Sequence, residues 1–78
     1  MKIETAAKKK MTVAALDLIE KNPAIDKRIM ERAFVESVIE VADEELSGLN
    51  QAELTDLTAT ATEMFAFAEH LFKKWGTN

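Results

Sequence analysis

The chain has 78 residues, no cysteine, and a formal net charge of −4 from 14 acidic and 10 basic residues. A chain of this length forms one domain near the lower limit of independent folding, and without cysteine it holds neither a disulfide nor a thiolate metal site. No apolar run approaches the ~20 residues that a membrane-spanning helix needs, and the start lacks the apolar core of a signal peptide. We therefore expect a cytoplasmic protein with no membrane partner.

The composition predicts an all-α fold. Two glycines and one proline leave few turn signals, whereas the abundant Ala, Leu, Glu and Lys favour helix. Turn and capping residues divide the chain into three predicted helices, at about residues 5–21, 23–46 and 51–75. Short connections imply antiparallel neighbours. We expect a single domain over residues 1–78, a compact three-helix bundle in which the third helix is the longest.

The first predicted helix, residues 5–21, carries one narrow apolar stripe that is rich in alanine. Its members are Met11, Ala14, Ala15, Leu18 and Ile19. Small side chains suit close packing of one helix on another, so we expect this stripe to lie against a neighbouring helix.

The start of the second predicted helix has two candidate positions. Asn22 can cap a helix whose first residue is Pro23, the place where proline is favoured. A start near Asp26 is the alternative.

The apolar side of the second helix changes partway along. At about 100° per residue, charged residues occupy one side of the first two turns, and Ile29, Met30 and Ala33 occupy the other. After Phe34 the charged side becomes apolar, with Val35, Val38, Ile39, Val41, Ala42 and Leu46. Two apolar patches on different sides of one straight helix must pack against two different surfaces. Either the other two helices cover them, or a second copy of the chain covers one.

The third predicted helix opens with a capping box, with Asn50 as N-cap and Glu53 three residues later. Apolar residues then follow a heptad pattern, widened by Phe65 and Phe72, and Gly76 is the expected stop. The pattern consists of Leu54, Leu57, Ala61, Met64, Ala68, Leu71 and Trp75. With Phe67 on its flank, the pattern leaves more apolar width than two short neighbouring helices hide, which favours self-association. The expected oligomer is a homodimer. The residues predicted for it are Leu54, Leu57, Met64, Leu71 and Trp75.

Charge is segregated along the sequence. Residues 1–32 contain eight basic and five acidic residues, a net charge of +3, whereas residues 33–72 contain nine acidic residues and no lysine or arginine. The acids are either the solvated faces of amphipathic helices or a surface that meets a basic protein patch. Under the second interpretation apolar anchors lie beside the acids. The predicted partner-binding residues are Leu49 and Phe67, with Glu36, Glu40, Glu44, Glu63 and His70.

Motifs of catalysis and cofactor binding are missing from the sequence. His70 is the single histidine, no cysteine or Gly-x-Ser-x-Gly elbow accompanies it, and Phe67 stands where a Glu-x-x-His metal motif needs glutamate. The glycines at 48 and 76 are too isolated to cradle a phosphate. We expect no catalytic residue, no metal and no cofactor.

Residues 15–34 resemble the opening two helices of a winged helix regulator. The resemblance implies that a recognition helix follows, with basic and amide side chains directed at DNA. Residues 35–45 instead read VESVIEVADEE, and these acids would repel phosphate. A DNA-binding regulator that uses the basic N-terminal third is kept as an alternative function.

The sequence favours a non-enzymatic protein–protein interaction module that occupies a partner protein. Small size and acidity are typical of inhibitors, adaptors and regulatory subunits, including accessory proteins of phages and mobile elements. A further alternative is a helical bundle that holds a small ligand. Met30, Met64, Phe65 and Phe72 would line its pocket, although the same four residues also suit an ordinary core.

Overall fold

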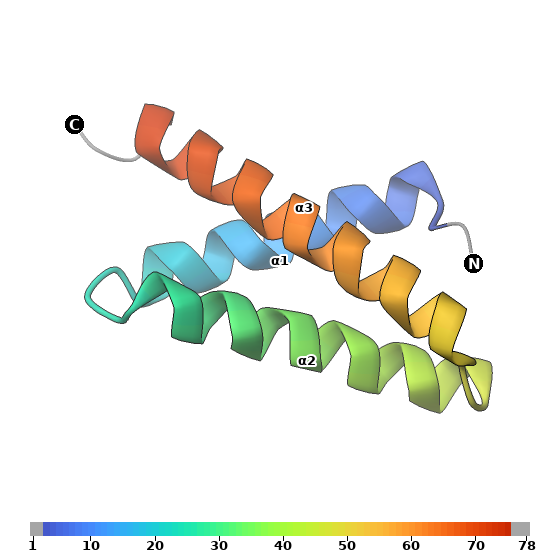
Figure 1. Ribbon diagram of the computed structural model, residues 1–78. Coiled ribbons are helices and arrows are strands. Elements are labelled where there is room, and N and C mark those ends of the chain that lie inside the picture. The colour runs from blue at the N-terminus through green and yellow to red at the C-terminus, as the bar shows by residue number, and fades with distance from the viewer. Residues whose placement is uncertain (1–2, 76–78) are drawn as a thin grey trace.

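Residues 3–75 are described by the computed structural model and form three helices: α1 (Thr5–Lys21), α2 (Lys27–Leu46) and α3 (Gln51–Trp75). No strand occurs in this range, so the fold is the predicted all-α three-helix bundle, with α3 the longest at 25 residues. In Figure 1, α3 crosses α1 and runs antiparallel to α2. The helices of residues 3–75 are not long and apolar enough to cross a membrane.

The connection between α1 and α2 differs from the first predicted boundary. Asn22 closes α1, because its backbone N–H donates to the carbonyls of Leu18 and Ile19, and its side-chain Nδ2 donates to Leu18 at 3.1 Å. Pro23 is therefore not the first residue of α2. The alternative start is confirmed: Asp26 is the N-cap, and its carboxylate accepts the Arg28 N–H at 2.7 Å.

The connection between α2 and α3 confirms the predicted capping box. Asn50 Oδ1 accepts the Glu53 N–H at 2.8 Å, and Glu53 Oε1 accepts the Asn50 N–H at 3.2 Å. The chain leaves α2 through two left-handed residues, Ser47 at φ 54° and Gly48 at φ 85°. Glycine adopts this conformation without steric cost, whereas serine does so at some expense.

The core lies where α3 packs on both other helices. Its buried members are Ala15 and Ile19 of α1, Met30 and Phe34 of α2, and Ala61, Phe65 and Ala68 of α3. The three alanines are 0% exposed, and such small side chains let the backbones of α1 and α3 cross closely. By contrast, α1 and α2 contact each other far less than either contacts α3. Helix α3 is thus the element that joins the other two.

Four apolar residues of α2 form one slanting stripe, whereas Val41 and Leu46, expected in the second apolar patch, are 54% and 50% exposed. Met30 and Phe34 are buried, and Val38 and Ala42 are half-buried. These positions follow one another in steps of four, which turns the stripe by about 40° per step. Ile29, which was expected beside Met30 in the first patch, is 62% exposed.

The contact face of α3 is also displaced from the predicted heptad pattern. Leu57, Ala61, Phe65 and Ala68 are its buried residues, so Phe65 lies at the centre of the face instead of widening it. Leu54, Met64, Leu71 and Phe72 are half-buried, and Trp75 is 65% exposed. The steps between these buried residues are four, four and three, and they replace the strict alternation of a coiled coil because α3 packs on two helices rather than on one. The predicted stop at Gly76 lies outside the described residues.

Candidate protein-interaction surfaces

An open groove of about 680 Å³ separates the first half of α1 from the second half of α2. We call it the α1–α2 groove. Most of its lining is apolar. The lining residues are Ile3, Glu4, Ala7, Met11, Ala14, Phe34, Ser37, Val38, Val41, Ala42, Glu45, Leu46 and Leu57.

The groove exists because α1 and α2 diverge from each other. Figure 1 shows the two helices closest at the turn that joins them and farthest apart at the start of α1. The side chains of Ala7 and Ala14 are too short to fill the resulting space. Phe34 and Leu57, which are 6% and 2% exposed, lie at its base. The alanines of the first predicted helix, both expected to pack against a neighbouring helix, therefore differ in position. Ala15 lies in the core, whereas Ala14 lines the groove.

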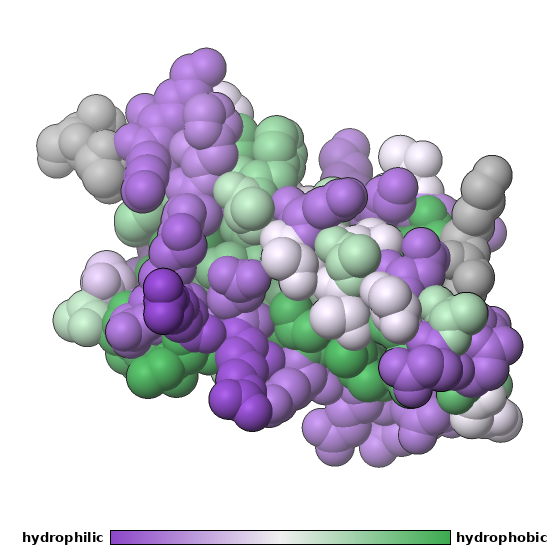
Figure 2. Space-filling model, viewed as in Figure 1, coloured by the Kyte–Doolittle hydropathy of each residue, from purple (hydrophilic) through white to green (hydrophobic). Residues whose placement is uncertain are grey.

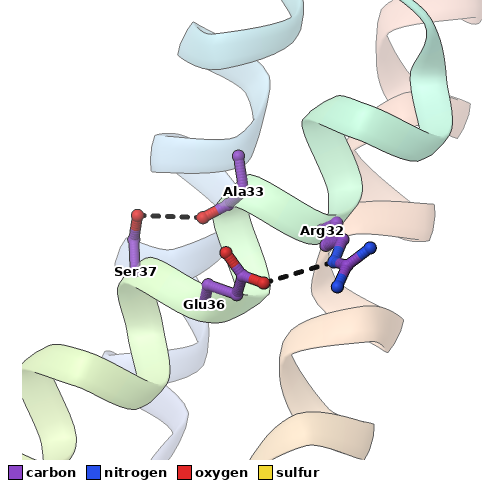
Figure 3. A network of polar contacts seen from close by, with 4 residues as sticks. All are labelled: Arg32, Ala33, Glu36 and Ser37. Carbon is purple, nitrogen blue, oxygen red and sulfur yellow. Dashed lines mark hydrogen bonds and ion pairs between the residues drawn. The ribbon is translucent and has the colours of Figure 1, made fainter.

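The α2 wall of the groove offers apolar contacts. Val41 and Leu46 are 54% and 50% exposed. The Ser37 hydroxyl donates to the Ala33 carbonyl within the helix at 2.9 Å, so its hydrogen is already used. Figure 3 shows Ser37 on a different side of α2 from the Arg32–Glu36 ion pair. A partner would meet valine and leucine here rather than free donors.

A second hollow, of about 390 Å³, lies between α1 and α3. Leu16, Glu20, Leu71, Phe72 and Trp75 line it. Two of the residues predicted for self-association, Leu71 and Trp75, come together there.

The other three predicted self-association residues lie elsewhere. Leu57 is buried at the base of the α1–α2 groove, and Leu54 is half-buried near the start of α3. Met64 contacts α1 through its sulfur, which accepts the Thr12 hydroxyl at 3.1 Å. The structure therefore does not gather the five residues into one face.

The predicted acidic residues of α2 form a column on its outer side. Glu36, Glu40 and Glu44 are exposed, and each comes two positions after a residue of the slanting stripe. Two positions correspond to about 200° of rotation, which directs the acids away from the core. Glu36 pairs with Arg32 at 3.2 Å, but both side chains are largely exposed, so the pair contributes little stability.

The predicted residues of α3 form a separate outer stripe. Glu63, Phe67 and His70 are exposed and spaced by four and three residues, so they share one side of the helix. Phe67, at 51% exposure, is its apolar member. Leu49, in the connection before α3, is half-buried. The seven predicted partner-binding residues thus occupy two outward faces and one turn. In Figure 2, polar surface covers much of the visible face and is interrupted by apolar areas beside α3.

The four residues proposed to line a ligand pocket mostly serve the core. Met30 and Phe65 are 7% and 1% exposed, and the Phe65 ring packs on Phe34. Met64 and Phe72 are half-buried. Within residues 3–75, no group of three His, Cys, Asp or Glu residues is placed to hold a metal ion.

Basic side chains of the N-terminal third are divided between two ends of the molecule. Lys8, Lys9 and Lys10 lie near the start of α1, whereas Arg28 and Arg32 line a shallow depression near the start of α2. Figure 1 places these two helix starts at opposite ends.

Sequence reasoning did not identify the α1–α2 groove. Val41 and Leu46 were recognised as apolar, yet nothing in the sequence shows that α1 stands away from them. The available signal is the short side chains of Ala7 and Ala14, which line the groove and do not fill it. No family model, curated protein or solved structure matches the chain.

Proposed function

We propose that the protein is a small acidic interaction module that acts by binding a basic surface of another protein. The observation that carries this proposal is the acidic charge that the fold leaves unneutralised. Of the nine acids in residues 33–72, only Glu36 and Glu69 form ion pairs, with Arg32 and Lys27. The other seven have no ion pair within the described part of the chain.

The end of α2 concentrates this charge. Asp43, Glu44 and Glu45 lie in its last turn, which contains no basic residue. The carboxyl end of a helix already carries partial negative charge, so acids there oppose the helix dipole. An arrangement that costs stability in the isolated chain becomes favourable when a cationic surface approaches. Complementary charge of this kind accelerates encounter and selects the partner.

Phe67 is the proposed apolar anchor on the second outward face, the outer stripe of α3, where Glu63 is the neighbouring acid. Exposed charge pairs contribute little affinity, and binding energy concentrates in a few residues, among which aromatic side chains are enriched. Phe67 is half exposed between Glu63 and His70 on the outer stripe of α3. By occupying a basic site on its partner, the module would act as an inhibitor, adaptor or regulatory subunit.

Affinity capture from the native host tests the proposal. Wild-type protein, Glu40→Lys, Phe67→Ala and the control Asp17→Lys would serve as baits, with bound protein identified by mass spectrometry and bound nucleic acid quantified. We expect a basic protein to bind wild type and the control, and to bind Glu40→Lys and Phe67→Ala more weakly. Asp17 is an exposed acid of α1, so the control reverses the same charge outside residues 33–72.

Capture of nucleic acid instead of protein would contradict the proposal. If duplex binding were also lost on Lys27→Ala and Arg28→Ala and weakened steeply with salt, the function would be that of a DNA-binding regulator.

A further inference from the structure

We propose that the hollow between α1 and α3 is a binding site for an arginine side chain of a partner protein. We call it the α1–α3 hollow, and its lining residues are Leu16, Glu20, Leu71, Phe72 and Trp75. None of the residues proposed above to meet a basic partner lines it, so the two surfaces are separate and can be tested independently.

The floor of the hollow is apolar and is supported by the core. Leu16 and Phe72 are partly buried and pack against the core residues. Leu71 and Phe72 lie four and three residues before Trp75, so the three share one side of α3. Leu16 and Glu20, four residues apart, share one side of α1. The packing of α1 on α3 therefore fixes the two walls of the hollow relative to each other.

Trp75 gives the hollow an uncovered aromatic ring. It is 65% exposed, more than the other exposed large hydrophobic residues of the described chain. Among aromatic side chains tryptophan attracts cations most strongly, provided that the cation lies over the ring within about 6 Å of its centre. An exposed tryptophan beside an apolar floor is suited to a ligand that joins an apolar stem to a cationic head.

Glu20 supplies a carboxylate that no cation of the described chain neutralises. The ion pairs of residues 3–75 do not include Glu20. Lys21, the basic residue in the last turn of α1, pairs instead with Asp17, with 3.0 Å between Nζ and Oδ2. Lys73 and Lys74 do not line the hollow, and Glu20 is the single charged residue among those that do. The charge inside the hollow therefore favours a cation and disfavours an anion.

An arginine side chain meets these requirements together. Its guanidinium group is flat, stacks on aromatic rings and donates two parallel hydrogen bonds to a carboxylate. Its methylene stem packs on apolar surface. A lysine ammonium has neither the flat face nor the paired donors. The guanidinium would thus stack on Trp75 and donate to Glu20, with the stem over Leu16 and Leu71.

Titration with short peptides tests the site, and Trp75, the single tryptophan, reports on it directly. The probes are acetyl-Gly-Arg-Gly-amide and the same peptide with citrulline, which has the shape of arginine without its charge. With the arginine peptide at millimolar concentration we expect saturable changes in tryptophan fluorescence and in the indole N–H signal of the NMR spectrum, since one side chain makes few contacts. The citrulline peptide should leave both signals unchanged.

Two variants of α1 test the role of the carboxylate. Glu20→Gln should weaken binding of the arginine peptide by about fivefold, because the amide keeps the shape of the side chain and loses its charge. Asp17→Asn is the matched control and should leave binding unchanged, since Asp17 is an exposed acid of the same helix that does not line the hollow. Circular dichroism would establish that both variants are folded.

Free guanidinium ion separates an arginine side chain from a small cation. Without a stem to pack on the apolar floor, it should bind about tenfold more weakly than the arginine peptide. Equal binding would overturn the assignment to arginine.

Three other outcomes would overturn the site itself. The first is the absence of a saturable change in both tryptophan signals. The second is equal binding of the arginine and citrulline peptides, which would mean that charge is not recognised. The third is equal affinity of Glu20→Gln and Asp17→Asn for the arginine peptide, which would remove the carboxylate of the hollow from the contact.

Discussion

The ring of Phe34 packs against the ring of Phe65, with centroids 5.9 Å apart and planes tilted by 41°. This contact joins α2 to α3 at the centre of the core, where Phe65 is 1% exposed. Phe67, two positions further along α3, is 51% exposed. Two aromatic residues of one helix therefore have different roles that substitution can separate.

Phe65→Ala should lower the free energy of unfolding by about 3 to 5 kcal/mol, because it removes a buried ring and leaves a cavity. Phe67→Ala should lower it by less than about 1 kcal/mol, since the ring is half exposed. Chemical denaturation followed by circular dichroism measures both. Equal losses would mean that Phe67 also packs in the core.

Phe67→Ala should weaken binding to the captured partner by more than about 1 kcal/mol while its melting temperature stays nearly unchanged. Titration calorimetry and a melting curve on the same preparation provide the comparison. A large loss of melting temperature with unchanged affinity per folded molecule would leave the outer stripe of α3 without a binding role.

Reversal of charge on the α2 column should act mainly on the rate of association. Glu36→Lys and Glu40→Lys remove attraction at long range, so the association rate should fall and its dependence on salt should become shallower. Surface plasmon resonance at several salt concentrations measures this. A change confined to the dissociation rate would argue against electrostatic steering.

Glu44→Lys should stabilise the chain, by about 0.3 to 1 kcal/mol at low salt, because it places a cation at the carboxyl end of α2. Glu40→Lys is the control, since Glu40 lies before the last turn and should gain less. Thermal melting compares the two. No gain for Glu44→Lys would show that the acidic last turn imposes no cost on folding.

Asn50→Ala should cost about 1 kcal/mol, because the Glu53 N–H loses its acceptor and the reciprocal capping box is broken. Asn50→Asp should retain most of the stability, since aspartate also caps helices well. Equal losses for both substitutions would show that the amide makes a contact other than the cap.

The end of a helix could be predicted from the sequence where a hydrogen bond between residues close in the chain fixes it. Asn50 and Glu53 lie three residues apart, so the sequence alone is sufficient to recognise their mutual bonds. Asn22 shows the limit of this reasoning. An asparagine before proline suits the start of a helix, yet here its side chain bonds backward to Leu18 and ends α1. Asn22 can either cap the start of the second helix or end the first one, and both roles rest on local hydrogen bonds. Only the position of the following helix decides between them.

The candidate surfaces depend on how the helices pack, which sequence periodicity does not specify. Periodicity placed Glu40 on the outer side of α2, and Glu40 is exposed. It placed Val41 in an apolar patch to be covered, whereas Val41 is 54% exposed. It could not show that α1 stands away from α2, because that divergence arises from how each helix packs on α3.

The central position of α3 has a consequence for biosynthesis. The ribosome synthesises α1 and α2 before α3, and these two helices contact each other little even in the folded chain. Most of their packing therefore has to wait for α3. Contacts such as that of Thr12 with Met64 connect positions 52 residues apart. Such long-range closure slows folding relative to bundles held by local contacts. Whatever part of α1 and α2 has left the ribosome therefore keeps its apolar side uncovered until α3 emerges and packs on it, and chaperones would encounter the chain in this interval.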